Sequence, residues 1–95
     1  MPYTIIIPIH NEEANIPALL EGLKPYNISH EILIIDDGST DGSYKLLKEY
    51  SFINLIRLEY NSGKGIAIRR GIENSAHEKI VISDLLKVKG IKNDT

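Results

Sequence analysis

The sequence predicts an α/β fold in which a mainly parallel, four-stranded sheet carries helices on both faces. Short apolar runs of strand length alternate with segments of helical periodicity along the chain, and this alternation favours parallel strands joined by right-handed crossovers. The apolar run at residues 32–35 is uninterrupted, which is typical of a strand covered on both faces. We expect the strand order 3-2-1-4, which creates a crevice where the fourth strand crosses back beside the first.

The individual elements follow from short apolar runs and the turns between them. Strands are predicted at residues 4–9, 32–35, 53–60 and 79–83. Helices are predicted at residues 16–23, after the polar turn that ends at Gly42, and after the glycine-rich turn at residues 61–65. Polar residues alternate with apolar ones at 56–60, so the third strand is expected nearer a sheet edge than its neighbours.

Three finer expectations concern the helices. Asn15 is expected to cap the first helix. The second helix is expected to be capped by at least one of three residues, Ser39, Thr40 and Asp41. The third is expected to present an apolar face through residues that recur at helical spacing, Ile68, Ile72 and Ala76.

Carboxylates follow three of the predicted strands. Glu12 comes just after the first strand, Asp36 and Asp37 after the second, and Asp84 after the fourth. Because ligands of parallel sheets bind beyond the carboxyl ends of the strands, we expect these acids to gather along one rim. Such a cluster repels itself unless it is neutralised, which favours a metal ion or a ligand rich in hydroxyl and N–H donors.

Composition excludes several functional classes. The 95 residues correspond to one domain with an ordinary apolar content and a net charge of −2. There is no cysteine, so disulfides and thiolate chemistry are excluded, and the three histidines lack metal-ligand spacing. No basic cluster is interleaved with aromatic residues, so nucleic acid is not an expected partner. The chain shows no membrane segment and no signal peptide, and the expected location is the cytoplasm.

Two local motifs have competing interpretations. The polar turn fits the start of a calcium-binding loop, but Lys48 stands where that loop requires a bidentate Glu, so a calcium site is rejected. The Gly63-Lys64-Gly65 turn either begins a helix with a solvated lysine or brings Lys64, Arg69 or Arg70 to a ligand phosphate. His10 is either an ordinary loop residue or a ligand contact.

Four segments carry a resemblance to a known family, in the same order and spacing: PIHNEEANIPALL, EILIIDDGSTDGS, NSGKGIAIRRGI and KIVISD. Together they cover residues 3–84 and resemble the N-terminal half of a family 2 glycosyltransferase of the GT-A fold, similar to the dolichyl-phosphate mannose synthase type. The resemblance implies a Rossmann-like, three-layer αβα half-domain that binds a UDP- or GDP-sugar. By position, the residues implied to contact the nucleotide sugar are Pro8, His10, Glu12, Asp36, Asp37, Lys64 and Asp84.

The resemblance also assigns roles to these residues. It implies that Asp36 and Asp37 hold the base and ribose, and that Asp84 begins the Asp-x-Asp motif that binds the diphosphate and a divalent metal, Mg²⁺ or Mn²⁺. Leu86 stands where the second acid of that motif is expected, so metal binding should be weakened. The family continues well beyond this length, and its second half carries the acceptor site and the catalytic base. We therefore expect a donor-binding domain at residues 1–84 and a divergent tail at 85–95.

Two functions remain open from the sequence. The first is a glycosyltransferase domain that binds a nucleotide-sugar donor and, as this chain, is truncated and weakly active or inactive. The alternative is a non-catalytic binding or assembly module that pairs with another subunit. Residues 80–82 would leave an exposed sheet edge in either case, which favours self-association. A membrane-bound acceptor would bring the cytoplasmic chain to the inner membrane surface. A receiver-like acidic pocket is disfavoured, because receivers place their paired acids after the first strand.

Overall fold

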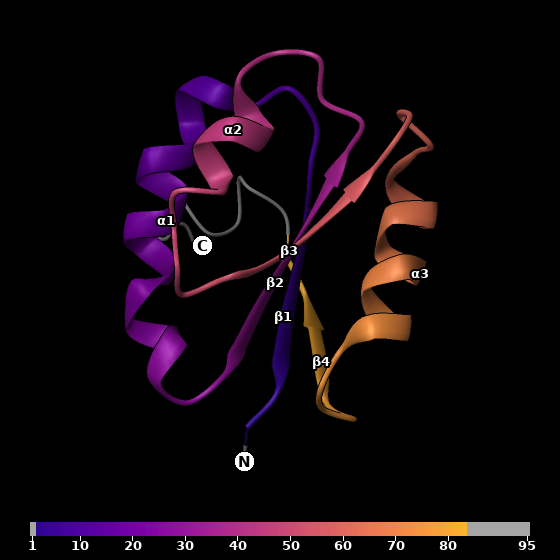
Figure 1. The fold of residues 1–95 in the computed structure, drawn as a ribbon. Helices are drawn as coiled ribbons and strands as arrows, with labels where there is room; N and C mark the ends of the chain where they lie inside the picture. The colour runs from indigo at the N-terminus through magenta and orange to yellow at the C-terminus, as the bar shows by residue number, and fades with distance from the viewer. Residues whose placement is uncertain (1, 84–95) are drawn as a thin grey trace, which may run out of the picture.

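The computed structural model describes residues 2–83, which form a four-stranded sheet between two layers of helices (Figure 1). The strand order is β3-β2-β1-β4, and every neighbouring pair is parallel. The predicted fold class and strand order are therefore confirmed. Asp84, Leu86 and the tail expected at residues 85–95 lie outside the described residues.

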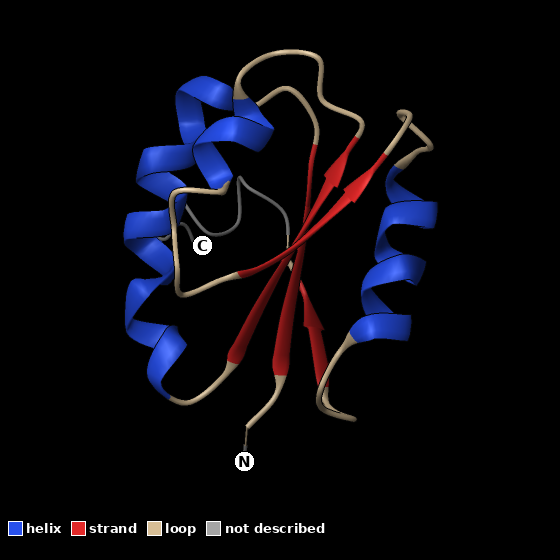
Figure 2. Ribbon diagram, viewed as in Figure 1, coloured by secondary structure: helices blue, strands red, loops and turns tan. Residues whose placement is uncertain are grey.

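Strands and helices alternate along the chain, as Figure 2 shows. In chain order the elements are β1 (Thr4–Ile9), η1 (Glu13–Asn15), α1 (Ile16–Leu23), η2 (Lys24–Ile28), β2 (Glu31–Asp37), α2 (Ser43–Leu47), β3 (Asn54–Leu58), α3 (Lys64–Asn74) and β4 (Ile80–Ile82). β2 extends past its apolar run because Asp36 and Asp37 still pair with Arg57 and Leu58 of β3. Both acids therefore belong to the strand and not to the turn after it.

The core divides into two halves, one on each face of the sheet. α1 and α2 cover one face, and α3 covers the other (Figure 1). Alternate residues of β1 and β2 point to opposite faces, so that Ile5 and Ile7 pack under α1 while Ile6 packs on the α3 side. Because the two central strands are buried on both sides, they need apolar residues at every position. This explains the uninterrupted run at residues 32–35.

The two outer strands differ from the central ones. Asn54 and Arg57 of β3 are exposed, which confirms the expected position of this strand at an edge. β4 forms the other edge of the described sheet, and Val81 and Ile82 are 43% and 47% exposed. Large apolar side chains therefore lie open on this edge.

The buried face of α3 differs from the predicted one. The helix ends at Asn74, so Ala76 lies beyond it, and Ile72 is 46% exposed. Its buried residues are Ala67 and Gly71. A Cβ atom added at Gly71 would lie 2.8 Å from Cγ2 of Ile6, so the helix backbone approaches the sheet closely. The helical spacing of apolar residues predicted a different face from the one that packs on the sheet. Because the helix lies so close to the sheet, only small residues fit between them.

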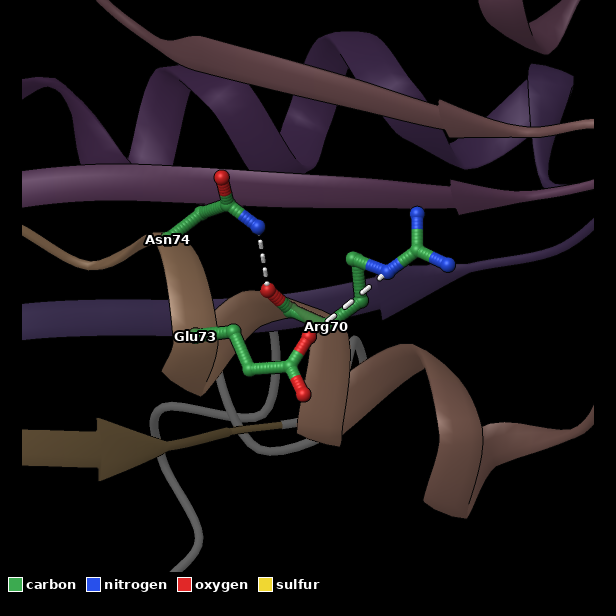
Figure 3. A network of polar contacts seen from close by, with 3 residues as sticks. All are labelled: Arg70, Glu73 and Asn74. Carbon is green, nitrogen blue, oxygen red and sulfur yellow. Dashed lines mark hydrogen bonds and ion pairs between the residues drawn. The ribbon is translucent and has the colours of Figure 1, made fainter.

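The end of α3 is held by its own side chains (Figure 3). Nδ2 of Asn74 donates a 2.8 Å hydrogen bond to the carbonyl oxygen of Arg70, four residues earlier in the same helix. Nε of Arg70 lies 3.9 Å from Oε1 of Glu73, and both side chains are about half exposed. A surface pair of this kind contributes little to stability. It nevertheless holds the Arg70 side chain beside Glu73, and Arg70 itself lies almost two turns after the start of α3.

The helix starts also differ from the capping predictions. Asn15 occupies the N-cap position of α1, but its side chain makes no capping hydrogen bond to the helix. Its Nδ2 instead donates to Oε1 of Glu12 at 2.7 Å. Gly42 occupies the N-cap position of α2. Asp41 nevertheless accepts the amide of Ser43, the first residue of α2, at 2.9 Å, so the predicted side-chain bond forms one residue earlier.

Glu31 joins three segments at the end of the sheet where the strands begin. Its carboxylate accepts hydrogen bonds from Thr4 of β1 at 2.7 Å, from Asn54 of β3 at 2.6 Å and from the amide of Ala76 at 2.8 Å. Burial acts to raise the pKa of Glu31, but these three bonds and the nearby His77 outweigh it and lower the pKa below its ordinary value. The ionised form therefore stabilises the fold, and this contribution is lost in acid as the carboxylate becomes protonated.

The close approach of α3 to the sheet predicts different effects at two glycines of the same helix. Gly71→Val should lower the free energy of unfolding by about 1–3 kcal/mol, because its side chain would overlap the buried Ile6. Gly65→Val is the matched control, since among the described residues nothing beyond the adjoining helix backbone lies within 4 Å of a Cβ added there. It should change the stability by no more than about 0.5 kcal/mol. Urea unfolding of both variants measures the difference, and equal losses would contradict the close packing.

Candidate functional site

The loops that follow β1, β2 and β3 meet at the carboxyl end of the sheet, where open parallel sheets bind their ligands (Figure 1). We call this region the strand-end rim, and it comprises Asp37 at the end of β2 together with the loops at residues 10–13, 38–43 and 59–63. Hydrogen bonds join each of these loops to at least one other. The rim is therefore one connected polar structure built on a rigid sheet.

Asn11 fastens the first loop to the second. Its backbone has a φ of 51°, a left-handed conformation that Asn adopts more readily than most residues. Its amide donates to Oγ of Ser39 at 2.8 Å, and its side-chain Oδ1 accepts the amides of Thr40 and Asp41 at 2.8 and 3.2 Å. One side chain thus fixes the backbone of the opposing loop.

Three further bonds extend this junction. The amide of Glu12 donates to Oγ of Ser43 at 3.0 Å, and the amide of Glu13 donates to Oδ2 of Asp41 at 3.3 Å. In return, Oε1 of Glu13 accepts the amide of Gly42 at 3.0 Å. Hydrogen bonds from the hydroxyl and amide of Ser43, together with the amide of Glu13, lower the pKa of the exposed Asp41 carboxyl below its ordinary value.

An open pocket of about 500 Å³ lies beside this junction. It is lined by Asn11, Glu12, Glu13, Ala14, Asn15 and Asp41. Three of these six residues carry carboxylates, so the pocket wall is acidic. Within residues 2–83, however, no three His, Asp or Glu side chains come together as metal ligands.

Asp37 joins the second loop to the third. The residue is only 4% exposed, and its two carboxylate oxygens accept the amides of Ser62 at 2.7 Å and Gly63 at 3.0 Å. The backbones of these loops also touch, because a Cβ added at Gly38, whose φ is 66°, would lie 2.3 Å from backbone atoms of the third loop. Asp37 therefore sets the position from which α3 begins.

Asp36 and Asp37 do not act as a pair of neighbouring carboxylates. Successive strand residues point to opposite faces, and the carboxylate of Asp37 reaches the start of α3. Asp36 is fully buried; its Oδ1 accepts the amide of Ser39 at 3.3 Å, and its Oδ2 has no hydrogen-bond partner among the described residues. The two adjacent acids of the sequence thus have different surroundings and different partners.

The remaining predicted site residues are spread around the rim. Pro8 lies within β1 and is half-buried, and His10 follows the strand, with its ring nitrogens facing the carbonyl of Asp37 and the side chain of Asn61. Lys64 is the exposed first residue of α3. Asp84, the expected metal ligand, lies outside the described residues.

Sequence reasoning missed the residues that hold the rim together. They are polar and short, and they sit in the loops after the strands: Asn11, Ser39, Ser43 and Ser62. Small polar residues are common in every turn, so their presence alone carried little signal. Their partners lie 25 or more residues away in the sequence, and only the folded sheet brings them together.

The double bond of Asp37 to the third loop predicts a large effect of a small substitution. Asp37→Asn replaces one acceptor oxygen by an N–H donor that faces a backbone amide, and it should lower the free energy of unfolding by about 1–3 kcal/mol. Hydrogen exchange at Ser62 and Gly63 should become faster. Asp41→Asn is the matched control, because Asp41 is exposed and water can replace its lost bonds. Unchanged protection at Ser62 and Gly63 in Asp37→Asn would refute this role.

Comparison with known proteins supports the resemblance deduced from the sequence. The chain is 38% identical over 84 residues to the dolichyl-phosphate beta-glucosyltransferase of Dictyostelium discoideum, an alignment that covers 73% of this chain and 26% of that protein. It is 31% identical over 96 aligned positions to the human protein of the same name, covering 85% of this chain and 30% of that one. The chain therefore spans less than a third of the length of these curated relatives.

Solved structures show the same fold. TarS of S. aureus superposes with a TM-score of 0.79 at 26% identity, covering 90% of this chain and 16% of that one. The mannosyltransferase PcManGT of Pyrobaculum calidifontis, solved with GDP-Man and Mn²⁺, gives a TM-score of 0.69 at 25% identity and covers 87% of this chain and 27% of its own. The fold of residues 2–83 is thus that of GT-A glycosyltransferases. The model of glycosyl transferase family 2 matches residues 4–85, and this chain belongs to that family.

Proposed function

We propose that this chain binds a nucleotide-diphosphate sugar at the strand-end rim, as the donor-binding part of an enzyme that transfers the sugar to a polyprenyl phosphate. The observation that carries the proposal is the joining of three strand-end loops into one polar rim around buried Asp37. The relatives support the two substrate classes. Some are named dolichyl-phosphate or undecaprenyl-phosphate transferases, and one structural neighbour was solved with GDP-Man.

The carboxylates of the rim keep capacity to accept hydrogen bonds from a ligand. An ionised carboxylate offers about four lone-pair sites, and the hydrogen bonds to Asp37 described above occupy two of them. Oε1 of Glu12 accepts Nδ2 of Asn15, which leaves its second oxygen for a hydroxyl group. We assign the base and ribose to Pro8, His10, Glu12, Asp36 and Asp37. Ribose hydroxyls and base N–H groups supply the donors that such acceptors require.

The diphosphate is assigned to the other side of the rim. Lys64 is exposed at the start of α3, where its ammonium group is free to approach a phosphate oxygen. We further propose that a divalent metal, Mg²⁺ or Mn²⁺, binds together with the nucleotide through Asp84. A single carboxylate is a weak site for such an ion unless substrate phosphates complete the coordination, so Leu86 at the position of the expected second acid should make metal binding depend on nucleotide.

Binding is proposed without efficient transfer. Attack by an acceptor hydroxyl or phosphate oxygen needs an acceptor site, and a hydroxyl also needs a general base. We assign neither to residues 2–83. The chain should therefore bind a donor weakly and turn it over slowly.

Donor binding is tested by titrating UDP- and GDP-sugars while observing backbone amide signals. Shifts are expected at residues 8–12 and 36–38, with a dissociation constant on the order of 1 mM, or about −4 kcal/mol. Glu12→Gln should weaken binding, because a neutral amide is a poorer acceptor than a carboxylate. Glu21→Gln is the matched control, as Glu21 is exposed on α1 outside the rim. The absence of shifts at high ligand concentration would refute donor binding.

Metal binding is tested with Leu86→Asp. This substitution restores a second acid two residues after Asp84, so Mn²⁺ should broaden the signals near residue 84 more strongly in the variant than in the parent. The effect should still require the nucleotide, whose diphosphate oxygens complete the coordination shell. Leu85→Asp places the same charge one residue away and serves as the control. Equal broadening in parent and Leu86→Asp chains would remove residues 84–86 from the proposed site.

A non-catalytic module that pairs with another chain is the second candidate. It is favoured by β4, a described edge strand whose Val81 and Ile82 are nearly half exposed, because unpaired strand edges associate with other strands. The donor titration separates the two candidates. Signals of the rim respond to nucleotide sugar if the first holds, and remain unchanged if the chain is only an assembly module.

A further inference from the structure

We propose that His10 is a positioning residue that holds the strand-end rim in its binding arrangement only while its imidazole is neutral. His10 is the residue at which the three loops of the rim converge. It directly follows β1, one ring nitrogen faces the carbonyl of Asp37 at the end of β2, and the other faces Asn61 of the third loop. The inference deepens the proposed donor binding and rests on it where affinity is concerned.

The surroundings of His10 fix which ring nitrogen carries the proton. Nδ1 lies 2.8 Å from the carbonyl oxygen of Asp37, and a carbonyl oxygen can only accept, so Nδ1 carries the hydrogen. Nε2 lies 3.3 Å from Nδ2 of Asn11 and 3.4 Å from Nδ2 of Asn61. An amide nitrogen can only donate, so Nε2 must offer its lone pair. The neutral Nδ1–H tautomer satisfies both requirements.

The orientation of Asn11 is fixed independently of His10. Its Oδ1 accepts two backbone amides, those of Thr40 and Asp41. Rotating the side-chain amide by half a turn would point its NH₂ group at those two backbone N–H groups. Donors would then face donors, and both backbone hydrogen bonds would be lost. Nδ2 of Asn11 must therefore face His10. A directed chain of hydrogen bonds runs from His10 Nδ1–H to the Asp37 carbonyl, and from Asn11 Nδ2–H to His10 Nε2.

Protonation reverses one link of this chain. Imidazolium carries hydrogen on both nitrogens, so Nε2–H would then face the NH₂ groups of Asn11 and Asn61. Asn11 cannot turn its oxygen towards the ring without releasing the amides of Thr40 and Asp41. A proton on His10 therefore breaks the bond between Asn11 and the ring and loosens the junction between the first and second loops.

Other charged groups lie on the loops that meet at His10. They are Glu12 and Glu13, Asp37 and Asp41, and Glu59 and Lys64, from the first, second and third loop regions respectively. Among the described contacts, the carboxylates of the first two loops bond to partners other than the imidazole. The ring is thus held by a carbonyl and two neutral amides, and its response to pH depends on their fixed directions.

The first test needs no ligand. Imidazole ¹⁵N signals and backbone amides are followed from about pH 8 to about pH 5, the range in which histidines titrate. At the upper pH, His10 should show the Nδ1–H tautomer, which is the less common form in free histidine. The side-chain amide of Asn11 and the backbone amides of Thr40 and Asp41 should shift with the same midpoint as the ring. An Nε2–H tautomer, or loop amides that ignore the ring, would overturn the proposal.

The substitution Asn11→Asp distinguishes the proposed role of His10 from a merely structural one. An aspartate keeps an oxygen for the amides of Thr40 and Asp41 and tolerates the left-handed backbone. Its second oxygen faces Nε2 and pairs with imidazolium, so the midpoint of His10 should move to higher pH and the loop amides should stay in place in acid. His77→Gln is the control and should leave the His10 midpoint unaltered. An unmoved or lowered midpoint in Asn11→Asp would contradict the mechanism.

Donor affinity supplies the functional readout. Between about pH 8 and about pH 5, the parent chain should lose about tenfold in affinity for the UDP- or GDP-sugar that it binds, and Asn11→Asp should lose less than about threefold. Binding that is equally tight at both pH values while His10 titrates would overturn the positioning role. If neither sugar binds at any pH, the proposed function fails, while the ligand-free spectra still decide whether His10 controls the loops.

Discussion

The buried carboxylate of Asp37 is the constraint on which the site depends. It lies at the last position of β2, almost without solvent contact, and both of its oxygens accept amides at the start of α3. A buried carboxylate is costly unless hydrogen bonds satisfy it, so the third loop must return to this point. That requirement brings the backbone of residues 60–61 against Gly38 and places the start of α3 on the same rim as the first two loops.

The rest of the rim is built by side chains that bond to backbone. Asn11, Ser39 and Ser43 each accept at least one amide from a different loop or turn. Bonds of this kind fix backbone positions, which suits a site that must present fixed acceptors to a ligand. The proposed donor site is thus supported by a layer of short polar residues. Binding energy spent on ordering the loops is correspondingly smaller.

The chain also shows how a parallel sheet separates stability from chemistry. The apolar residues of β1 and β2 fill both halves of the core. The hydrogen bonds of Glu31 join segments at the end of the sheet opposite the rim. At the carboxyl ends of the same strands, the side chains become polar and the loops begin. Substitutions at the rim can therefore alter binding while most of the core stays intact, as is usual for loops carried on a rigid scaffold.

The sequence by itself determined the fold class, the strand order and the family, because apolar periodicity and four ordered motifs are properties of the linear chain. It also predicted which strand ends would carry acids. Only the tertiary structure decided what those acids contact: Asp36 and Asp37 are neighbours in sequence, yet their carboxylates have separate partners. It likewise placed Ala67 and Gly71, instead of Ile72 and Ala76, against the sheet. The physical reason is that hydrogen bonding and close packing depend on distances between segments that are far apart in the sequence, whereas periodicity records only which face of an element is apolar.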